Sequence, residues 1–417
     1  MRLAIRWHTV GAGFLVCLYM FFVFLHLWYY IYQFKDQRYN LSDVKQLYTG
    51  ARIVADGYGS QLYDFALQAD YQAEMPLPFG SLLPFNYPPY FAALLSPLAR
   101  LPFLVMYLIL SIGQWLAYGC AIWALKFLWG GWSREERFWL ITVVFGFPGV
   151  HHSARWGNPV LFIFLFVVLA FRAAYRDRRS ASPGVWLALA TIKPHLIAGL
   201  FWSFIAGKRT RPLIAASFAL VFLLAGAIIV VGFEGTISFG KVVATTFASG
   251  ETGAYSIKAA SMPNMRGLFT FIGLSPSSVR IGMLIFICSI ALFMGWLWRT
   301  RATSQSAKDE SLCWATTVPL MLLASPHLNP QDVSLAVLSG ILLWSHVRCR
   351  SNRRHAILCF LLLAPIASQF SFFWAGAAAN PQIWSVCNAL ILTGLAIFSL
   401  MEVHDHTTNR TSGPTIY

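Results

Sequence analysis

The chain has 417 residues, of which 57% are hydrophobic and only 11% are charged. Soluble globular proteins carry about 25% charged residues. This composition therefore excludes a soluble enzyme, a disordered chain and a nucleic-acid-binding domain, despite a formal net charge of +15. The 16 Trp, 16 Tyr and 34 Phe suit a protein with many membrane interfaces. We predict an all-α integral membrane protein that crosses the bilayer several times.

The chain begins with a basic stretch that leads into a long apolar run. This run is too long for a signal peptide and lacks a small-residue cleavage site, so it predicts a first membrane helix. A membrane helix needs about 20 apolar residues, and several of the runs that qualify are somewhat shorter. The predicted spans are 10–32, 102–128, 137–151, 158–175, 212–232, 279–298, 312–325, 332–347, 355–370 and 382–401.

Two further apolar stretches do not predict complete spans. Residues 88–99 form only about three helical turns. Residues 184–207 are divided by Lys193-Pro194 into halves that are each too short to cross. Proline breaks a helix interior, and a broken helix at membrane depth needs protein or a polar cavity around it. We therefore predict a re-entrant pair of half-helices with its tip at Lys193.

The distribution of charge predicts the orientation. With a cytoplasmic N-terminus and alternating sides, most Lys and Arg residues fall in short inner loops, in agreement with the positive-inside rule. The re-entrant segment keeps the basic clusters at 176–179 and 208–211 on the same side. We expect both termini in the cytoplasm and the protein in the inner or plasma membrane of a bacterium.

The prediction is a single domain, 1–417, with about 10–12 membrane helices, of which the C-terminal ones lie within 279–417. Two long extracytoplasmic loops, 33–101 and 232–278, contain many of the polar residues. Loops this long are usually functional or contain short helices of their own. Shorter polar loops at 151–158 and 325–332 lie on the same face, so we expect the chemistry there.

The first long loop carries the most informative motifs. Ser42-Asp43-Val44 is followed by Leu47-Tyr48, Asp56-Gly57 and Leu62-Tyr63-Asp64, then by Phe85-Asn86-Tyr87-Pro88-Pro89 and Pro97-Leu98-Ala99-Arg100-Leu101-Pro102. With Gly157-Asn158, Ile192-Lys193-Pro194-His195 and Ser325-Pro326-His327 through Asp332, this pattern resembles glycosyltransferase family 87. These are polyprenol-phosphate-mannose-dependent mannosyltransferase-like proteins of the GT-C superfamily, and the resemblance covers roughly residues 43–335.

The resemblance places the catalytic base at Asp43. Inverting sugar transfer needs one carboxylate to take the proton of the acceptor hydroxyl, opposite the leaving group. A lipid phosphate leaves without a general acid, so a single carboxylate is sufficient. The alternative role of Asp43 is the N-cap of the following helix. Asp36 and Asp64 are the other candidate bases, although Asp64 also suits a turn.

Lys193 is the candidate ligand of the donor phosphate. A charged Lys at membrane depth costs about 2.5–3.5 kcal/mol on insertion scales, so it requires a partner or a polar cavity. A lipid phosphate at a half-helix N-terminus provides such a partner. The alternative is an ion pair with a loop acid. Arg155 is a second phosphate candidate, or an interfacial residue that contacts lipid head groups.

The remaining candidates are assigned to substrate binding: Tyr48, Tyr87, His152, Asn158, Arg266, His327 and Asp332. His151-His152 lacks a third ligand at metal-binding spacing, so we predict no metal. The family more often has Gly-Gln-x-Asn where this chain has Gly157-Asn158-Pro159. For Asp332 a capping role is equally open, and for Arg266 a surface position.

These features predict a membrane glycosyltransferase that moves a sugar, mannose by the resemblance, from a polyprenyl-phosphate donor to a glycolipid or glycan acceptor. No cofactor and no nucleic-acid partner are expected. One alternative is a polytopic lipid or solute transporter or flippase of the cell envelope, since broken helices also suit transport. Another is a non-catalytic subunit of a polysaccharide assembly machine.

Overall fold

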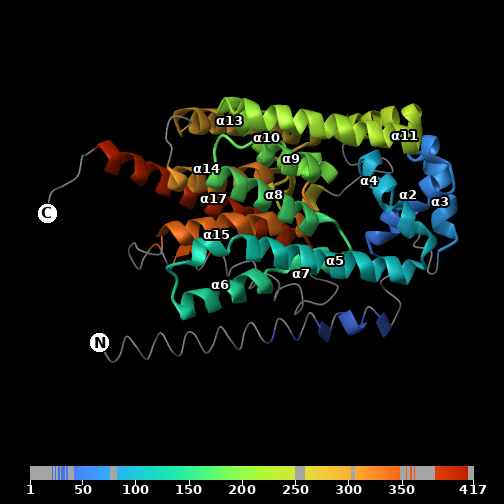
Figure 1. The fold of residues 1–417 in the computed structure, drawn as a ribbon, viewed down its shortest axis with the longest axis horizontal. Coiled ribbons are helices and arrows are strands. Elements are labelled where there is room, and N and C mark those ends of the chain that lie inside the picture. The colour runs from blue at the N-terminus through green and yellow to red at the C-terminus, as the bar shows by residue number, and fades with distance from the viewer. Residues whose placement is uncertain are drawn as a thin grey trace.

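The computed structural model describes residues 42–75, 82–248, 259–301, 306–347 and 381–411, with single positions between 21 and 35 and between 354 and 361. All regular elements in these ranges are helices, which confirms the predicted all-α class. They form an elongated bundle, with α2, α3 and α4 at one end and the ends of α13, α14 and α17 at the other (Figure 1). The predicted spans 10–32 and 355–370 lie mostly outside the described residues.

Four described helices are long and apolar enough to cross a membrane. These segments are Phe103–Ala124 in α5, Thr210–Ala244 in α11, Pro276–Arg301, which is α13, and Ser385–Asp405 in α17. Their outer faces are apolar and exposed: Phe218, Phe222 and Ile229 of α11 are 74%, 79% and 84% exposed. Such continuous exposed apolar surface is stable only against lipid, in agreement with a multi-pass membrane protein.

The other predicted spans correspond to shorter helices. The predicted span 137–151 is two helices, α6 (Arg134–Gly146) and α7 (Pro148–Trp156), because Pro148 cannot donate into the preceding turn. α7 also corrects the polar loop predicted at 151–158, most of which is helical. α8 (Val160–Arg176), α14 (Ala307–Ala324) and α15 (Ala336–Val347) follow the predicted boundaries more closely. α14 is buried from Asp309 to Leu323 and lies inside the bundle.

The segment around Lys193 is a broken helix, as predicted. α9 (Ser182–Leu189) continues as the short 3-10 helix η5 (Ala190–Ile192), and α10 (Pro194–Ala206) begins after Lys193, whose φ of −128° and ψ of 85° are not helical. Arginines before α9 and after α10 both bind the carboxylate of Glu310. Arg178 Nε lies 3.1 Å from Glu310 Oε2, and Arg209 Nη1 donates to Glu310 Oε1 at 2.8 Å. The segment therefore enters and leaves at the same end of the bundle.

The first long loop is a compact group of short helices. These are α2 (Val44–Ala55), η2 (Gly59–Gln61), α3 (Phe65–Ala73), α4 (Pro89–Leu95) and η3 (Ser96–Arg100). The Asp64 carboxylate accepts from the backbone N–H groups of Ala66 and Leu67 and so caps α3. Gln68 and Gln72 fasten the chain that returns from α3, through hydrogen bonds to Phe85 and Leu83. This group holds the start of α2 against the bundle.

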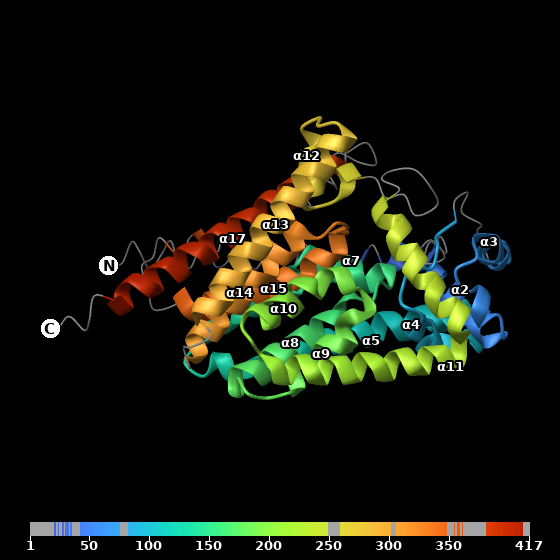
Figure 2. The same cartoon turned by 90° about the horizontal axis from the view of Figure 1, so that it is seen from above.

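The sequence analysis predicts that the second long loop begins at residue 232, and this prediction is wrong. Gly232 has φ 81° and bends α11 (Thr210–Ala248), whose helix then continues to Ala248. At the bend a Cβ on Gly59 would lie 2.7 Å from Val231 Cα, so the two backbones touch. After the bend α11 turns back past α2 and α4 (Figure 2). The loop also contains η6 (Ala259–Ser261) and α12 (Met265–Phe271), and the remaining short helices are η4 (Lys126–Trp129) and η7 (Pro330–Leu335).

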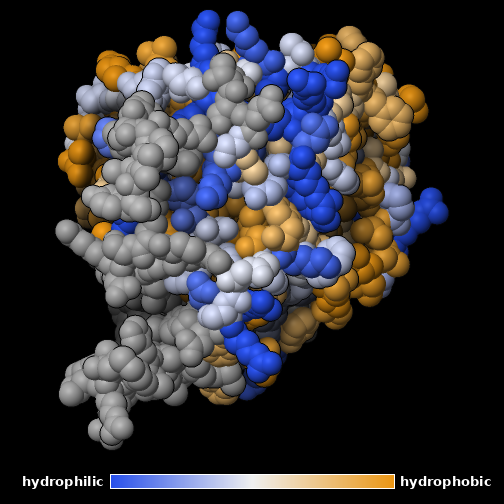
Figure 3. Space-filling model, turned by 60° about the vertical axis from the view of Figure 1, so that its left-hand side comes forward, coloured by the Kyte–Doolittle hydropathy of each residue, from blue (hydrophilic) through white to orange (hydrophobic). Residues whose placement is uncertain are grey.

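One end of the bundle carries a cluster of arginines and carboxylates. Glu310, with the two arginines that bind it, lies at the start of α14, and Arg301 at the end of α13 binds Asp309 at 2.8 Å. Figure 3 turns this end forward: many hydrophilic side chains run down the middle of the view, a hydrophobic patch lies among them, and hydrophobic surface lies to the right. Glu310 and Ala324 are separated along α14 by about 21 Å, so the residues after α14 lie well away from this basic end.

Candidate active site

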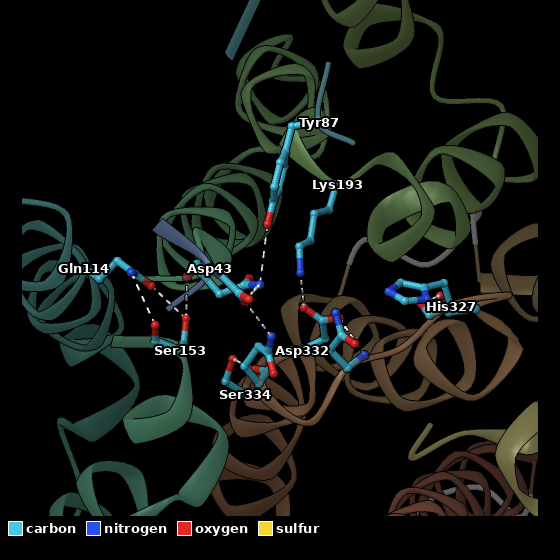
Figure 4. Close-up of polar contacts among 12 residues, drawn as sticks. Asp43, Tyr87, Gln114, Ser153, Lys193, His327, Asp332 and Ser334 are labelled. Carbon is cyan, nitrogen blue, oxygen red and sulfur yellow. Dashed lines mark hydrogen bonds and ion pairs between the residues drawn. The ribbon is translucent and has the colours of Figure 1, made fainter. Parts of the chain in front are cut away.

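Polar side chains from four helix junctions meet inside the bundle (Figure 4). Asp43 precedes α2, Asn158 lies between α7 and α8, Lys193 lies between η5 and α10, and Asp332 belongs to η7 after α14. Helix ends leave backbone groups unsatisfied and so favour polar residues nearby. Their convergence brings together residues that are far apart in the sequence.

The carboxylate of Asp43 is held through one of its two oxygens. Oδ2 accepts from Asn158 Nδ2 at 2.7 Å and from Gln331 Nε2 at 3.2 Å. Asp43 occupies the N-cap position of α2 but makes no side-chain capping hydrogen bond. Of the two roles considered for it, the carboxylate therefore does not cap the helix. No described residue donates to Oδ1, which leaves this oxygen for another proton donor.

The surroundings of Asp43 act on its pKa in opposite directions. Burial raises the pKa above its usual range, and the charge of Asp332 adds to this effect. The hydrogen bond from Asn158, the charge of Lys193 and the hydrogen bond from Gln331 lower it, but they do not cancel the effect of burial. A raised pKa makes the ionised carboxylate a stronger base near neutral pH, which suits proton abstraction.

Lys193 and Asp332 form a buried ion pair beside Asp43. Lys193 Nζ lies 2.7 Å from Asp332 Oδ1, and their side chains are 6% and 0% exposed. Oδ2 of Asp332 accepts from the backbone N–H of Asn329, so Asp332 also caps η7. Both oxygens of Asp332 are thus occupied, whereas a lysine ammonium has three N–H donors and this pair uses one of them. The Lys193 ammonium can therefore still donate hydrogen bonds to a ligand in the site.

Tyr87 and Asn158 lie next to each other beside Asp43. Asn158 Nδ2 lies 3.5 Å from the Tyr87 hydroxyl, and the Tyr87 carbonyl accepts from Tyr63 at 2.7 Å. Burial and the charges of Asp43 and Asp332 raise the pKa of Tyr87, so its hydroxyl stays protonated. Asn158 Oδ1 is buried and has no hydrogen-bond partner among the described residues. Buried polar atoms without partners are rare and costly, so this oxygen is a candidate for ligand binding.

Asn158 is itself fixed by residues that the sequence analysis did not single out. Ser153 Oγ lies 2.7 Å from both the Asn158 carbonyl and Gln114 Oε1. Gln114 is fully buried on α5. An amide side chain in an otherwise apolar membrane helix is a recognisable signal for a polar contact. Gln331, the second donor to Asp43, stands next to Asp332 in a motif noted from the sequence.

His327 lies on the side of Lys193 and Asp332 away from Asp43 (Figure 4), and Arg266 is close enough to act on its pKa. The rings of His195 and His327 are 5.6 Å apart in an edge-to-face arrangement. Burial lowers the pKa of His327 to about 3, with the charges of Lys193 and Arg266 acting in the same direction. Arg266 Nη1 donates to the Pro326 carbonyl at 3.1 Å, which ties α12 to the turn before η7.

The other predicted site residues lie on α2 and α7, the helices that adjoin Asp43 and Asn158. The Tyr48 hydroxyl donates to the Leu101 carbonyl at 2.9 Å and so joins α2 to η3. His152 and Arg155 lie on α7, where the Arg155 guanidinium is 5.6 Å from the centre of the Trp156 ring. Within the described ranges no three His, Cys, Asp or Glu side chains are grouped as metal ligands. That the site works without a metal stays a prediction.

Comparison with known proteins gives one match. The model of glycosyltransferase family 87 matches residues 85–326, which is more than half of the chain. No curated protein and no solved structure matches the chain. The matched range includes Tyr87, Asn158 and Lys193, and it ends just before His327.

Proposed function

This chain belongs to glycosyltransferase family 87 and is therefore a membrane glycosyltransferase; we propose that it transfers mannose from a polyprenyl-phosphate donor to an acceptor hydroxyl. The observation that carries the proposal is the state of the Asp43 carboxylate. One oxygen is held by two amides, the other accepts no hydrogen bond from a described residue, and a buried cation lies nearby. This arrangement suits a single general base facing an anionic leaving group.

In the proposed reaction, Oδ1 of Asp43 accepts the proton of the acceptor hydroxyl. The acceptor oxygen then bonds to the anomeric carbon, and the bond from that carbon to the phosphate oxygen breaks. The electron pair of that bond leaves with the polyprenyl phosphate. Attack from the side opposite the phosphate inverts the anomeric centre, so a β-linked donor would give an α-mannoside.

Lys193 would stabilise the negative charge that develops on the departing phosphate. Its ion pair with Asp332 holds the ammonium in place and leaves two N–H donors for phosphate oxygens. Preorganised charge of this kind is usually the largest contribution to such catalysis. Arg155 on α7 is proposed as a second, more distant cation.

The sugar and the acceptor would contact the groups around this centre. The unpartnered Asn158 Oδ1 and the Tyr87 hydroxyl are proposed to bind sugar hydroxyls. On the opposite side, His327, Arg266 and Asp332 are proposed to line the same space. Tyr48 on α2 and His152 on α7 are proposed to contact the substrates as well.

We further propose that the site opens to the extracytoplasmic face and that both termini lie in the cytoplasm. Arg178, Arg209 and Arg301 gather at the opposite end of the bundle, where the positive-inside rule places the cytoplasm. A membrane-impermeant thiol reagent should label Gln61→Cys, but not Arg179→Cys, in intact cells and in a cysteine-free background. The reverse pattern would refute this orientation.

The decisive experiment measures transfer from polyprenyl-phosphate mannose by the purified full-length protein. Asp43→Asn should reduce the rate by about 10²–10⁴-fold, the usual contribution of a general base. Asp64→Asn is the matched control, since Asp64 belongs to the same loop but caps α3. Unchanged activity in Asp43→Asn would reject Asp43 as the base. Transfer from other lipid-linked sugars, but not from this donor, would reject mannose.

A further inference from the structure

The start of α2 carries a second group of buried polar side chains beside Asp43. Ser42, Lys45, Gln46 and Thr49 are 0%, 2%, 9% and 0% exposed. The spacing of Lys45, Gln46 and Thr49 places them on one face of α2, and Ser42 lies just before the N-cap residue Asp43. A buried polar stripe needs hydrogen-bond partners, so the partners of these side chains indicate its role.

Three of these side chains, those of Ser42, Lys45 and Gln46, have no partner within the described part of the chain. The Thr49 hydroxyl donates to the Lys45 carbonyl at 2.8 Å. The Ser42 hydroxyl, in contrast, is buried without a hydrogen bond. No described carboxylate pairs with the Lys45 ammonium, and burial alone lowers the pKa of this lysine. An ammonium ion buried without a counter-charge destabilises the protein.

The backbone at this position also favours an anion. α2 has 12 residues, its first turn contains no acidic side chain, and Asp43 does not cap it. The Lys45 N–H donates to the Ser42 carbonyl at 3.0 Å. The other N–H groups of the first turn and the helix dipole attract negative charge. Lys45 belongs to this first turn and Ser42 directly precedes the N-cap residue Asp43, so three kinds of anion-binding group lie close together in the sequence at this helix end.

We propose that Ser42, Lys45 and the N-terminus of α2 bind a phosphate group of the acceptor. This inference rests on the proposed transfer reaction, because it makes an anionic lipid or glycan the second substrate. The donor phosphate is assigned to Lys193, whose charge acts on Asp43, whereas Lys45 is not among the charges that do so. The two phosphates would therefore occupy different places, with Asp43 accessible to both substrates.

The test uses dodecyl phosphate as the probe and the melting temperature of the full-length protein in neutral detergent as the readout. Dodecyl phosphate should raise the melting temperature of the wild type, and Lys45→Met should weaken its binding by about tenfold or more. Lys45→Arg should retain binding. Lys308→Met is the matched control, because Lys308 is an exposed lysine in the first turn of α14.

Without the probe, Lys45→Met should melt at a higher temperature than the wild type, because the substitution removes an unpaired buried charge. A lysine with a structural partner would give the opposite result and overturn the proposal. Lys193→Met distinguishes the two phosphate sites. If it abolishes the response to dodecyl phosphate while Lys45→Met leaves the response unchanged, the probe binds only at Lys193 and the inference is wrong.

Failure of this inference and failure of the transfer reaction remain distinguishable. Binding at Lys45 without transfer from any lipid-linked sugar would reject the proposed function and leave the anion site in place. Transfer that depends on Asp43, with a probe response unaffected by Lys45→Met, would retain the function and reject the anion site.

Discussion

Lys193 and Asp332, which are 139 residues apart in the sequence, form an ion pair of 2.7 Å between almost fully buried side chains. Loss of one member leaves a buried charge without a partner, which typically costs about 3–5 kcal/mol. We expect Lys193→Met and Asp332→Asn each to lower the melting temperature strongly. The double variant should recover part of the loss, because it removes both charges.

The exposed pair Arg52–Glu74 provides the control. It has a similar distance, 3.0 Å, but its side chains are 30% and 64% exposed. Exposed pairs contribute about 0–1 kcal/mol, so Glu74→Gln should barely change the melting temperature. Strictly additive losses in the double variant at Lys193 and Asp332 would show that the two side chains do not act as a pair.

A second prediction concerns the two amides that bind Asp43. Each lowers the pKa of a carboxyl whose pKa burial raises. Replacing Asn158 or Gln331 by Ala should therefore raise this pKa further, and the acidic limb of the rate profile should move to higher pH by about one unit. The sign follows because the base must be ionised, so activity falls as the pH drops through its pKa. Lys193, Asp332 and Tyr87 also face Asp43 and stay unchanged in these variants.

Transfer rates at saturating substrate between about pH 5 and pH 9 would measure this shift. Ser334→Ala is the matched control, since Ser334 binds the Gln331 carbonyl in η7 but does not reach Asp43. A loss of rate that is equal at all pH values would mean that the amides only support the fold.

Much of the fold was predictable from the sequence, because long apolar runs and proline act locally. Phe103–Ala124 and Pro276–Arg301 match predicted spans closely. The break at Lys193 follows from Pro194, and the re-entrant path follows from basic residues on both flanks. The positions of Asp43, Asn158 and Lys193 in one site follow from the family resemblance and not from composition.

The remaining features depend on contacts between distant segments. The sequence marks Gln114 as an amide in an apolar helix but does not identify its partner, and only packing brings Gln114 to Ser153 and Gln331 to Asp43. The continuation of α11 beyond Gly232 was missed because a glycine and several polar residues resemble the end of a span. Gly232 makes the bend because it adopts φ 81°, a second helical segment follows it, and the missing Cβ of Gly59 lets the bend pack closely against that residue.

Glu310 gives a third prediction, which separates stability from catalysis. Its fully buried carboxylate binds Arg178 and Arg209 and accepts from Trp314 at 2.8 Å. Glu310→Gln would leave two arginines without a counter-charge and should cost about 3–5 kcal/mol. Because this cluster lies at the opposite end of α14 from Asp332, activity per folded molecule should stay near that of the wild type.

Melting temperature and transfer rate, normalised to folded protein, would test this separation. Glu136→Gln is the control: Glu136 belongs to the exposed capping box of α6, and its replacement should cost about 1 kcal/mol or less. A large fall in normalised rate would indicate coupling between the basic end and the site.

The last prediction concerns Gly157, which ends α7 and precedes Asn158. Its φ of 67° lies in the left-handed region, and a Cβ there would lie 2.0 Å from Val44 Cγ2. Gly157→Ala should therefore strain the backbone by about 1 kcal/mol and push the start of α2, where Asp43 is located. We expect a lower melting temperature and a fall in transfer rate of about tenfold or more.

Adding Val44→Ala should restore part of the rate, since it removes the clash but not the strain. Gly119→Ala is the control, because Gly119 lies within α5 with open space around it and alanine favours the helix. Wild-type rates in Gly157→Ala would show that the junction of α7 and α8 does not position the catalytic carboxylate.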